Sequence, residues 1–192
     1  MSLKEMISIS TKVIPSVDEI ISESLKRHNF TPQDVEENFS DSVETLERIA
    51  NGIYNEYENK CLETFVQKWI RQRRLDDIEK IKILNCENYV EKLKNEFLEF
   101  AKAIQNLEKH LGNMRKARGG KSFEKIILIL LRMIEITCEI PKGEYRNRLK
   151  RIDIVIPSSQ QAINYPDRSV FLTCKRTLRE RWKQEVPQVG PN

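Results

Sequence analysis

The helical spacing of apolar residues through about the first 110 positions limits most strongly how this chain can fold. One stripe recurs every three or four residues and predicts a long helix that reaches Trp69 or Ile70. Its members are Leu46, Ile49, Ile53, Tyr57 and Cys61. A second stripe predicts a helix from Cys86 to His110 that ends at Leu111-Gly112-Asn113. Its members are Tyr89, Leu93, Phe97, Phe100, Ile104 and Leu107.

Two earlier helices begin with capping signals. Ser16 and Glu19 have the spacing of a capping box, in which each side chain bonds the backbone N–H of the other residue. Thr31 precedes Pro32, and proline is favoured at the first position of a helix. These signals and the two stripes predict a helical N-terminal region over residues 1–112.

The pattern changes after residue 112. It predicts a helix capped by Ser122, strands over 134–140, 148–157 and 169–175 with a loop over 158–168, and a helix over 177–186. Strands that follow and precede helices make this half α/β, and with the helical N-terminal region the fold class is α/β (α+β). We therefore expect a second domain over 113–192, with a small mixed sheet flanked by helices.

The composition excludes several classes of protein. The longest apolar run, 126–131, is interrupted by Arg132 and is far shorter than the about 18 residues of a membrane span. The first residues, MSLKEMISIS, lack the apolar segment of a secretory signal, so we expect a cytoplasmic protein with no membrane segment. The four cysteines and two histidines form no zinc-ligand spacing and give little support for nucleophilic catalysis by Ser-His or Cys-His pairs.

Charge is distributed unevenly along the chain. Residues 1–100 hold 14 Lys and Arg against 20 Asp and Glu, a net charge of −6. Residues 101–192 hold the other 19 and 9, a net charge of +10. This asymmetry indicates a polyanionic partner for the second half, or packing of the acidic half on the basic half. Basic clusters lie at 115–121 and 146–151, and a third follows Lys175. Loops that carry cations beside glycine can bind a phosphate with both side chains and backbone N–H groups. Four residues of the first cluster are therefore candidate phosphate contacts: Arg115, Lys116, Arg118 and Lys121.

One acid interrupts the apolar strand predicted over 148–157. Asp153 has Ile on both sides, and a buried carboxylate is unfavourable unless it is paired or binds a metal. Lys175 ends the next strand 22 residues later, so neighbouring strands would set an ammonium beside the carboxylate. Such a pair suits Mg²⁺-dependent phosphodiester hydrolysis, and Glu124 on the preceding helix could add a second carboxylate. A structural ion pair is the alternative.

A charged triplet, Arg179-Glu180-Arg181, lies in the helix predicted directly after Lys175. In a DNA major groove, an arginine fork matches guanine O6 and N7, and a carboxylate accepts from cytosine N4. The triplet could therefore read two adjacent C·G pairs. The alternative is an ordinary charged helix surface.

Four motifs together resemble a known family: RxxRGGKSFE ending at Glu124, RxDIVIPS around Asp153, FLTCK ending at Lys175, and RTLRERW over 176–182. The segment from Arg115 to Glu185 resembles the type II restriction endonucleases of the PD-(D/E)XK nuclease superfamily. Within it, the segment looks most like the EcoRII-type branch, which reads sites containing CC/GG.

The resemblance implies a fold, an activity and residue roles. It implies a restriction-endonuclease-like core after the helical N-terminal region, and an enzyme that cleaves double-stranded DNA as a homodimer at a short CC/GG palindrome with Mg²⁺. Asp153 would bind the metal, Glu124 would complete the acidic site, and Lys175 would be the catalytic lysine. Arg179, Glu180 and Arg181 match the triplet that reads the CC/GG pairs.

The sequence also departs from the family pattern. Thr173 lies two positions before Lys175, where many relatives have Glu, and the Glu that usually substitutes for it, 13 residues after the lysine, is Gln188 here. Family members normally continue beyond the position of Asn192 with a further strand and helices, so we expect a C-terminally shortened core. Gln188 and this terminus favour one alternative, a DNA-binding protein of the same fold with impaired catalysis. The other alternative is a helical interaction protein with an acidic partner.

Overall fold

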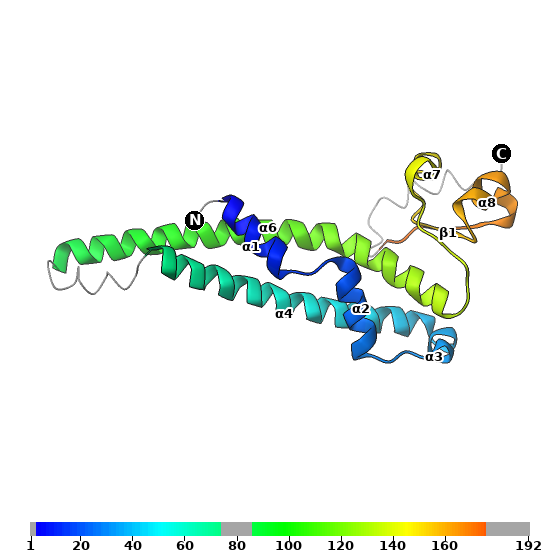
Figure 1. Cartoon of the computed structure of the whole chain (residues 1–192), viewed down its shortest axis with the longest axis horizontal. Coiled ribbons are helices and arrows are strands. Elements are labelled where there is room, and N and C mark those ends of the chain that lie inside the picture. Colours follow the sequence, from blue (N-terminus) through cyan, green and yellow to red (C-terminus); the bar gives the residue numbers. More distant parts are fainter. Residues whose placement is uncertain (1–2, 74–85, 176–192) are drawn as a thin grey trace. The chain divides into compact units, whose positions relative to one another are not determined.

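The computed structural model describes residues 3–73 and 86–175. Figure 1 shows the elements along the chain. In order they are α1 (Leu3–Val13), α2 (Val17–Arg27), α3 (Pro32–Glu37), α4 (Phe39–Arg73), α6 (Cys86–Met133), α7 (Gly143–Arg148), β1 (Ile154–Ile156), α8 (Ser159–Asn164), the 3-10 turn η2 (Pro166–Arg168) and β2 (Val170–Leu172). Helices dominate and the described sheet is small, so the expected α+β class is confirmed.

The contacts divide the chain into two units. Unit 1 consists of Met1–Arg27 and Arg48–Arg118, and unit 2 consists of His28–Glu47 and Gly119–Asn192. The long helices α4 and α6 each supply residues to both units. The domain boundary expected near residue 112 stays a prediction.

Unit 1 is a helical unit in which α1 and α4 lie along α6 (Figure 1), and these helices share one apolar core. Most members of the two predicted stripes lie in or against this core, as expected for the buried faces of amphipathic helices. Phe65, Trp69 and Phe100 form an aromatic cluster, with ring centroids 5.7 to 6.2 Å apart. The cap predicted at Ser16 is present, since the Ser16 N–H donates to Glu19 Oε2 at 2.8 Å and the Glu19 N–H donates to Ser16 Oγ at 3.3 Å.

Unit 2 begins with α3, whose N-cap Thr31 and following Pro32 agree with the prediction. Its sheet is an antiparallel pair in which Ile154 lies opposite Leu172, and Ile156 opposite Val170. An isolated bridge joins Glu139 to Val155. The second core cluster contains buried Leu131, Cys138 and Ile154, so the end of α6 packs against β1.

The predicted end of the second long helix at Gly112 is wrong. α6 continues without a break to Met133 and includes the helix predicted from Ser122. A glycine inside a helix costs only about 1 kcal/mol. Leu111 and Ile126, on either side of the glycines, are fully buried, and this burial offsets the cost.

The strand predicted over 134–140 is present only as the single bridge from Glu139 to Val155. α6 ends in a tight turn, in which Glu135 has a φ of 62° and the Ile136 N–H donates to Leu131 O at 3.0 Å. This 6→1 hydrogen bond is the kind that closes a helix with a left-handed residue. The isoleucines that suggested a strand instead pack as loop residues against the second core cluster.

Two other predicted spans differ in detail. The strand expected over 148–157 is limited to β1, because α7 and a turn occupy the residues before it. The loop expected over 158–168 contains α8, whose N-cap Ser158 accepts a hydrogen bond from the Gln161 N–H at 3.2 Å. The helix predicted over 177–186 lies outside the described residues. None of the helices in the described ranges is both long enough and apolar enough to cross a membrane.

Candidate active site

The start of β1 positions Asp153, the acid that interrupts the apolar strand. Its backbone N–H donates to Leu172 O at 2.9 Å, which continues the β1–β2 pairing by one step. Its side chain is only 11% exposed, and Oδ2 accepts the Cys174 N–H at 2.7 Å. The strand pairing therefore fixes this carboxylate at the end of β2.

Lys175 follows β2 and lies beside this carboxylate. Its Nζ is 3.8 Å from Asp153 Oδ2, and its side chain is 45% exposed. Asp153 is therefore nearly buried while its cationic partner remains open to solvent. A partly exposed ammonium can contact an anionic ligand and its carboxylate partner at the same time. The catalytic roles expected of the two residues stay predictions.

Glu124, on α6, belongs to the same group of charges. Burial raises the pKa of its carboxyl, and the negative charge of Asp153 raises it further. Three cations, Arg146, Lys175 and Lys121, lower the pKa in part. Two carboxylates and several cations thus act on one another across α6, α7 and the β1–β2 pair.

Cys174 precedes Lys175 and is affected by the same charges. Burial raises its pKa to about 11, and the negative charges of Asp153 and Glu124 contribute to the increase. The thiol therefore stays protonated at neutral pH and adds no charge to the group. Its backbone N–H, which binds Asp153, is its contribution to the geometry.

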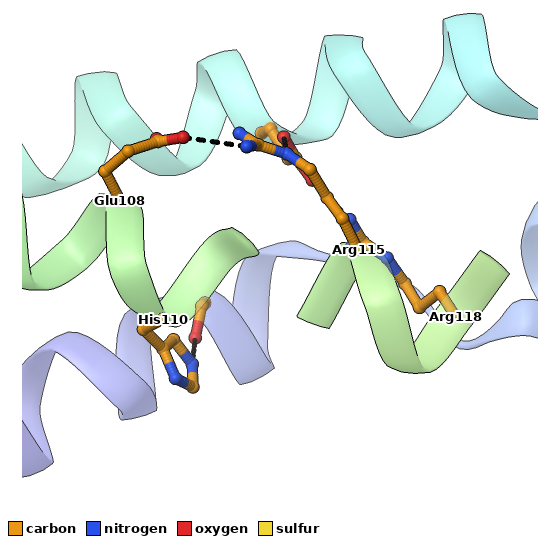
Figure 2. A network of polar contacts seen from close by, with 6 residues as sticks. Glu108, His110, Arg115 and Arg118 are labelled. Atoms are coloured by element: carbon orange, nitrogen blue, oxygen red, sulfur yellow. Dashed lines mark hydrogen bonds and ion pairs between the residues drawn. The ribbon is translucent and has the colours of Figure 1, made fainter. Parts of the chain in front are cut away.

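The four candidate phosphate contacts lie where the sequence passes from unit 1 into unit 2. In unit 1, Arg115 donates from Nε to Glu58 Oε2 at 2.8 Å and from Nη1 to Glu108 Oε1 at 2.7 Å (Figure 2). Arg118 also donates to Glu58, and its guanidinium lies 4.2 Å from the centre of the Tyr54 ring. Lys116 and Lys121 are exposed.

Glu58 is a structural residue that the sequence analysis missed. Its side chain is 7% exposed and receives hydrogen bonds from both arginines. A signal for it was present, because Glu58 takes the helical register of the buried residues Tyr54, Cys61 and Phe65. Ser10 and His110 form a second missed contact in unit 1, with Oγ 2.9 Å from Nε2 (Figure 2).

The remaining predicted site residues follow Lys175 in the sequence. The triplet that we expect to read bases, Arg179, Glu180 and Arg181, lies outside the described residues, and so does Gln188. Within residues 3–73 and 86–175, no group of three or more His, Cys, Asp or Glu side chains is arranged to hold a metal ion.

Solved structures of restriction endonucleases have the same fold. The chain matches two complexes of metal-depleted Ecl18kI with uncleaved DNA, at 19% identity. The TM-score is 0.73 for the complex whose DNA is modified and 0.74 for the other complex. Each match covers 98% of this chain and 63% of the Ecl18kI chain. A PspGI–substrate DNA complex matches with a TM-score of 0.59 at 24% identity, over 93% of this chain and 62% of PspGI. The fold is that of a restriction endonuclease.

Sequence comparison identifies the family. The family described as EcoRII C terminal matches residues 81–188, more than half of the chain. The chain therefore belongs to the EcoRII C-terminal family. The type II restriction enzyme SsoII of Shigella sonnei is 31% identical over 97 residues, which is 47% of this chain and 32% of SsoII. The chain thus corresponds to less than two thirds of the length of these relatives.

Proposed function

We propose that this protein is a type II restriction endonuclease that hydrolyses phosphodiester bonds in double-stranded DNA. The observation that carries the proposal is the Asp153–Lys175 pair, 3.8 Å apart, with Glu124 acting on the same charges. Membership of the EcoRII C-terminal family and the similarity of this chain to the restriction enzyme SsoII both support the proposal. We propose that the enzyme acts on DNA in the cytoplasm.

The proposed roles of the site residues follow from their charges. Asp153 and Glu124 would hold Mg²⁺, because proteins bind this ion through one or two carboxylates together with water and substrate phosphates. A bound divalent cation would offset the repulsion between these two carboxylates. The bound metal would polarise the scissile phosphate and lower the pKa of an attacking water. Lys175, anchored by Asp153, would stabilise the negative charge that develops on the phosphate.

The target we propose is a short palindrome containing CC/GG. Arg179 and Arg181 would bind guanines and Glu180 would bind a cytosine. A palindrome presents two equivalent half-sites and one such site cuts one strand, so the active form would be a homodimer. Lys116 and Lys121 would contact phosphates, whereas Arg115 and Arg118 would stay bound to Glu58.

A plasmid digest tests this function. Incubation of a plasmid of mixed sequence with the protein and Mg²⁺ should give discrete fragments, and a chelator should suppress them. Asp153→Asn serves as the matched inactive variant. Intact plasmid together with a sequence-specific gel shift would instead favour the DNA-binding protein with impaired catalysis, for which Gln188 is the motivating residue.

A further inference from the structure

Residues 142–151, which include α7, form the strongest exposed concentration of positive charge in the described part of unit 2. Five of the ten residues are Lys or Arg and one, Glu144, is acidic. All five cationic residues are exposed, and none forms an ion pair within the described ranges. We call them the α7 cationic surface: Lys142, Arg146, Arg148, Lys150 and Arg151.

The basic segment at 115–121 differs from this surface. The charges of Arg115 and Arg118 are compensated by Glu58 and Glu108 within unit 1. None of the five cations of the α7 cationic surface forms an ion pair with a carboxylate among the described residues, and all five side chains are exposed to solvent. An uncompensated cluster of this kind attracts the phosphates of nucleic acid far more strongly than a paired one.

A side-chain hydrogen bond joins the C-terminal part of this surface to the residues that follow β2. Arg151 has a left-handed φ of 69°, and its carbonyl accepts a hydrogen bond from Thr173 Oγ1 at 3.3 Å. Arg151 lies two positions before Asp153, and Thr173 lies two positions before Lys175. The end of the cationic segment is therefore fixed at the edge of the candidate active site.

The helical part of the surface leads through a hydrogen-bonded turn into this C-terminal part. The Leu149 N–H donates to Tyr145 O at 2.8 Å and closes α7, and the Ile152 N–H donates to Leu149 O at 3.2 Å in the turn that follows. The positive charge of Arg146 reaches Glu124, where it opposes the effect of burial. The surface thus extends from Arg146, near one site carboxylate, to Arg151, near the other.

We infer that the α7 cationic surface binds the DNA backbone next to the cleaved bond, with Arg146 and Arg151 nearest to the scissile phosphate. The inference rests on the proposed function, because it takes duplex DNA as the ligand. Contacts of this type position the duplex without reading its sequence. They would leave base recognition to other residues.

The test compares two variants with equal changes in charge. The first carries Arg146→Gln, Arg148→Gln, Lys150→Gln and Arg151→Gln. Arg151→Gln keeps a side chain with the same backbone strain at a φ of 69°. The control removes four exposed lysines of α6 in unit 1, by Lys92→Gln, Lys94→Gln, Lys102→Gln and Lys109→Gln. Circular dichroism and thermal melts establish that both variants fold.

The measurement is binding to a CC/GG duplex and to a scrambled duplex in Ca²⁺, over a series of salt concentrations. The slope of log affinity against log salt should fall in magnitude by about 0.9 for each phosphate that the variant no longer binds, equally for both duplexes. The control should keep the wild-type slope. Cleavage by the single variant Arg146→Gln, measured at saturating DNA, should also be slower than wild type.

The outcomes separate this inference from the proposed function. Wild-type protein that bound neither duplex would overturn both. Wild-type binding with an unchanged slope in the α7 variant would overturn the inference and leave the endonuclease proposal intact. An equal decrease in slope in the variant and its control would also overturn it, because the effect would then come from total charge rather than from this surface.

Discussion

Replacing the buried carboxylate Glu58 tests how the basic segment of α6 is held in unit 1. Glu58 lies on α4 and binds Arg115 and Arg118 of α6, so one acid ties two helices together (Figure 2). We expect Glu58→Ala and Glu58→Gln to destabilise unit 1. We do not expect either change to strengthen DNA binding, because the arginines serve the helix contact.

The size of the effect follows from what each arginine loses. Removing one partner from a fully buried ion pair costs about 3–5 kcal/mol. Arg115 is 46% exposed and keeps Glu108, so water and that acid compensate much of its loss. Arg118 is 12% exposed, and its Nη1 is already buried without a hydrogen-bond partner in the described part of the chain. We therefore expect about 3 kcal/mol for Glu58→Ala and about 1–2 kcal/mol for Glu58→Gln, whose amide oxygen can still accept from one arginine.

Urea unfolding followed by tryptophan fluorescence measures this change. Trp69 is buried in the core of unit 1, and a Trp182→Phe background leaves it as the single tryptophan of the chain. The matched control is Glu56→Gln, two positions away on α4. Glu56 binds Arg27, and both side chains are more than 40% exposed, so its loss should shift the midpoint much less.

Two results would refute the reasoning. A Glu58→Ala midpoint no lower than that of Glu56→Gln would show that the buried network contributes nothing beyond a surface pair. A rise in DNA affinity in Glu58→Gln, with a salt slope steeper by about 0.9 for each arginine released, would show that Arg115 and Arg118 are phosphate contacts in competition with Glu58.

Three further predictions concern the candidate active site. Asp153→Asn and Lys175→Ala should each reduce the cleavage rate at least about 100-fold while DNA affinity stays equal or, for Asp153→Asn, rises; retained cleavage in either variant would remove that residue from the site. Burial raises the pKa of the Glu124 carboxyl above its ordinary 4.5. The folded protein therefore has its full stability below pH 4.5, where this carboxyl is neutral, and loses part of it as the pH rises through the raised pKa. In chelator, Glu124→Gln should therefore melt at a higher temperature than wild type at pH 8 and at the same temperature at pH 4, and an equal difference at both pH values would contradict this. Arg179→Ala or Arg181→Ala should lower the preference for CC/GG over scrambled duplexes by about five- to 150-fold in Ca²⁺ competition binding, and an equal loss for every duplex would make these residues phosphate contacts.

The parts of the fold that could be predicted from the sequence are those decided by neighbouring residues. The capping residues Ser16 and Thr31 bond to groups three positions away, so their local spacing was sufficient. The helical stripes were equally local. Gly112 misled the prediction because a glycine ends a helix only where the chain can turn away, and here fully buried side chains on both sides favour continuation. That preference comes from residues distant in sequence, which spacing alone does not reveal.

Glu58 and Asp153 show why the candidate site could be predicted only in part. Each is an acid in an apolar pattern, and each is nearly buried. Glu58 binds two guanidinium groups that compensate its charge inside the helical unit. Asp153 has one partly exposed lysine, one backbone N–H and a second carboxylate that acts on the same charges. Pairing with two arginines closes the Glu58 site to ligands. The partly exposed Lys175 ammonium and the neighbouring acid leave room for a cation and a phosphate at Asp153. The sequence pattern locates both acids, but only the partners that the fold brings to them separate a structural ion pair from a candidate catalytic one.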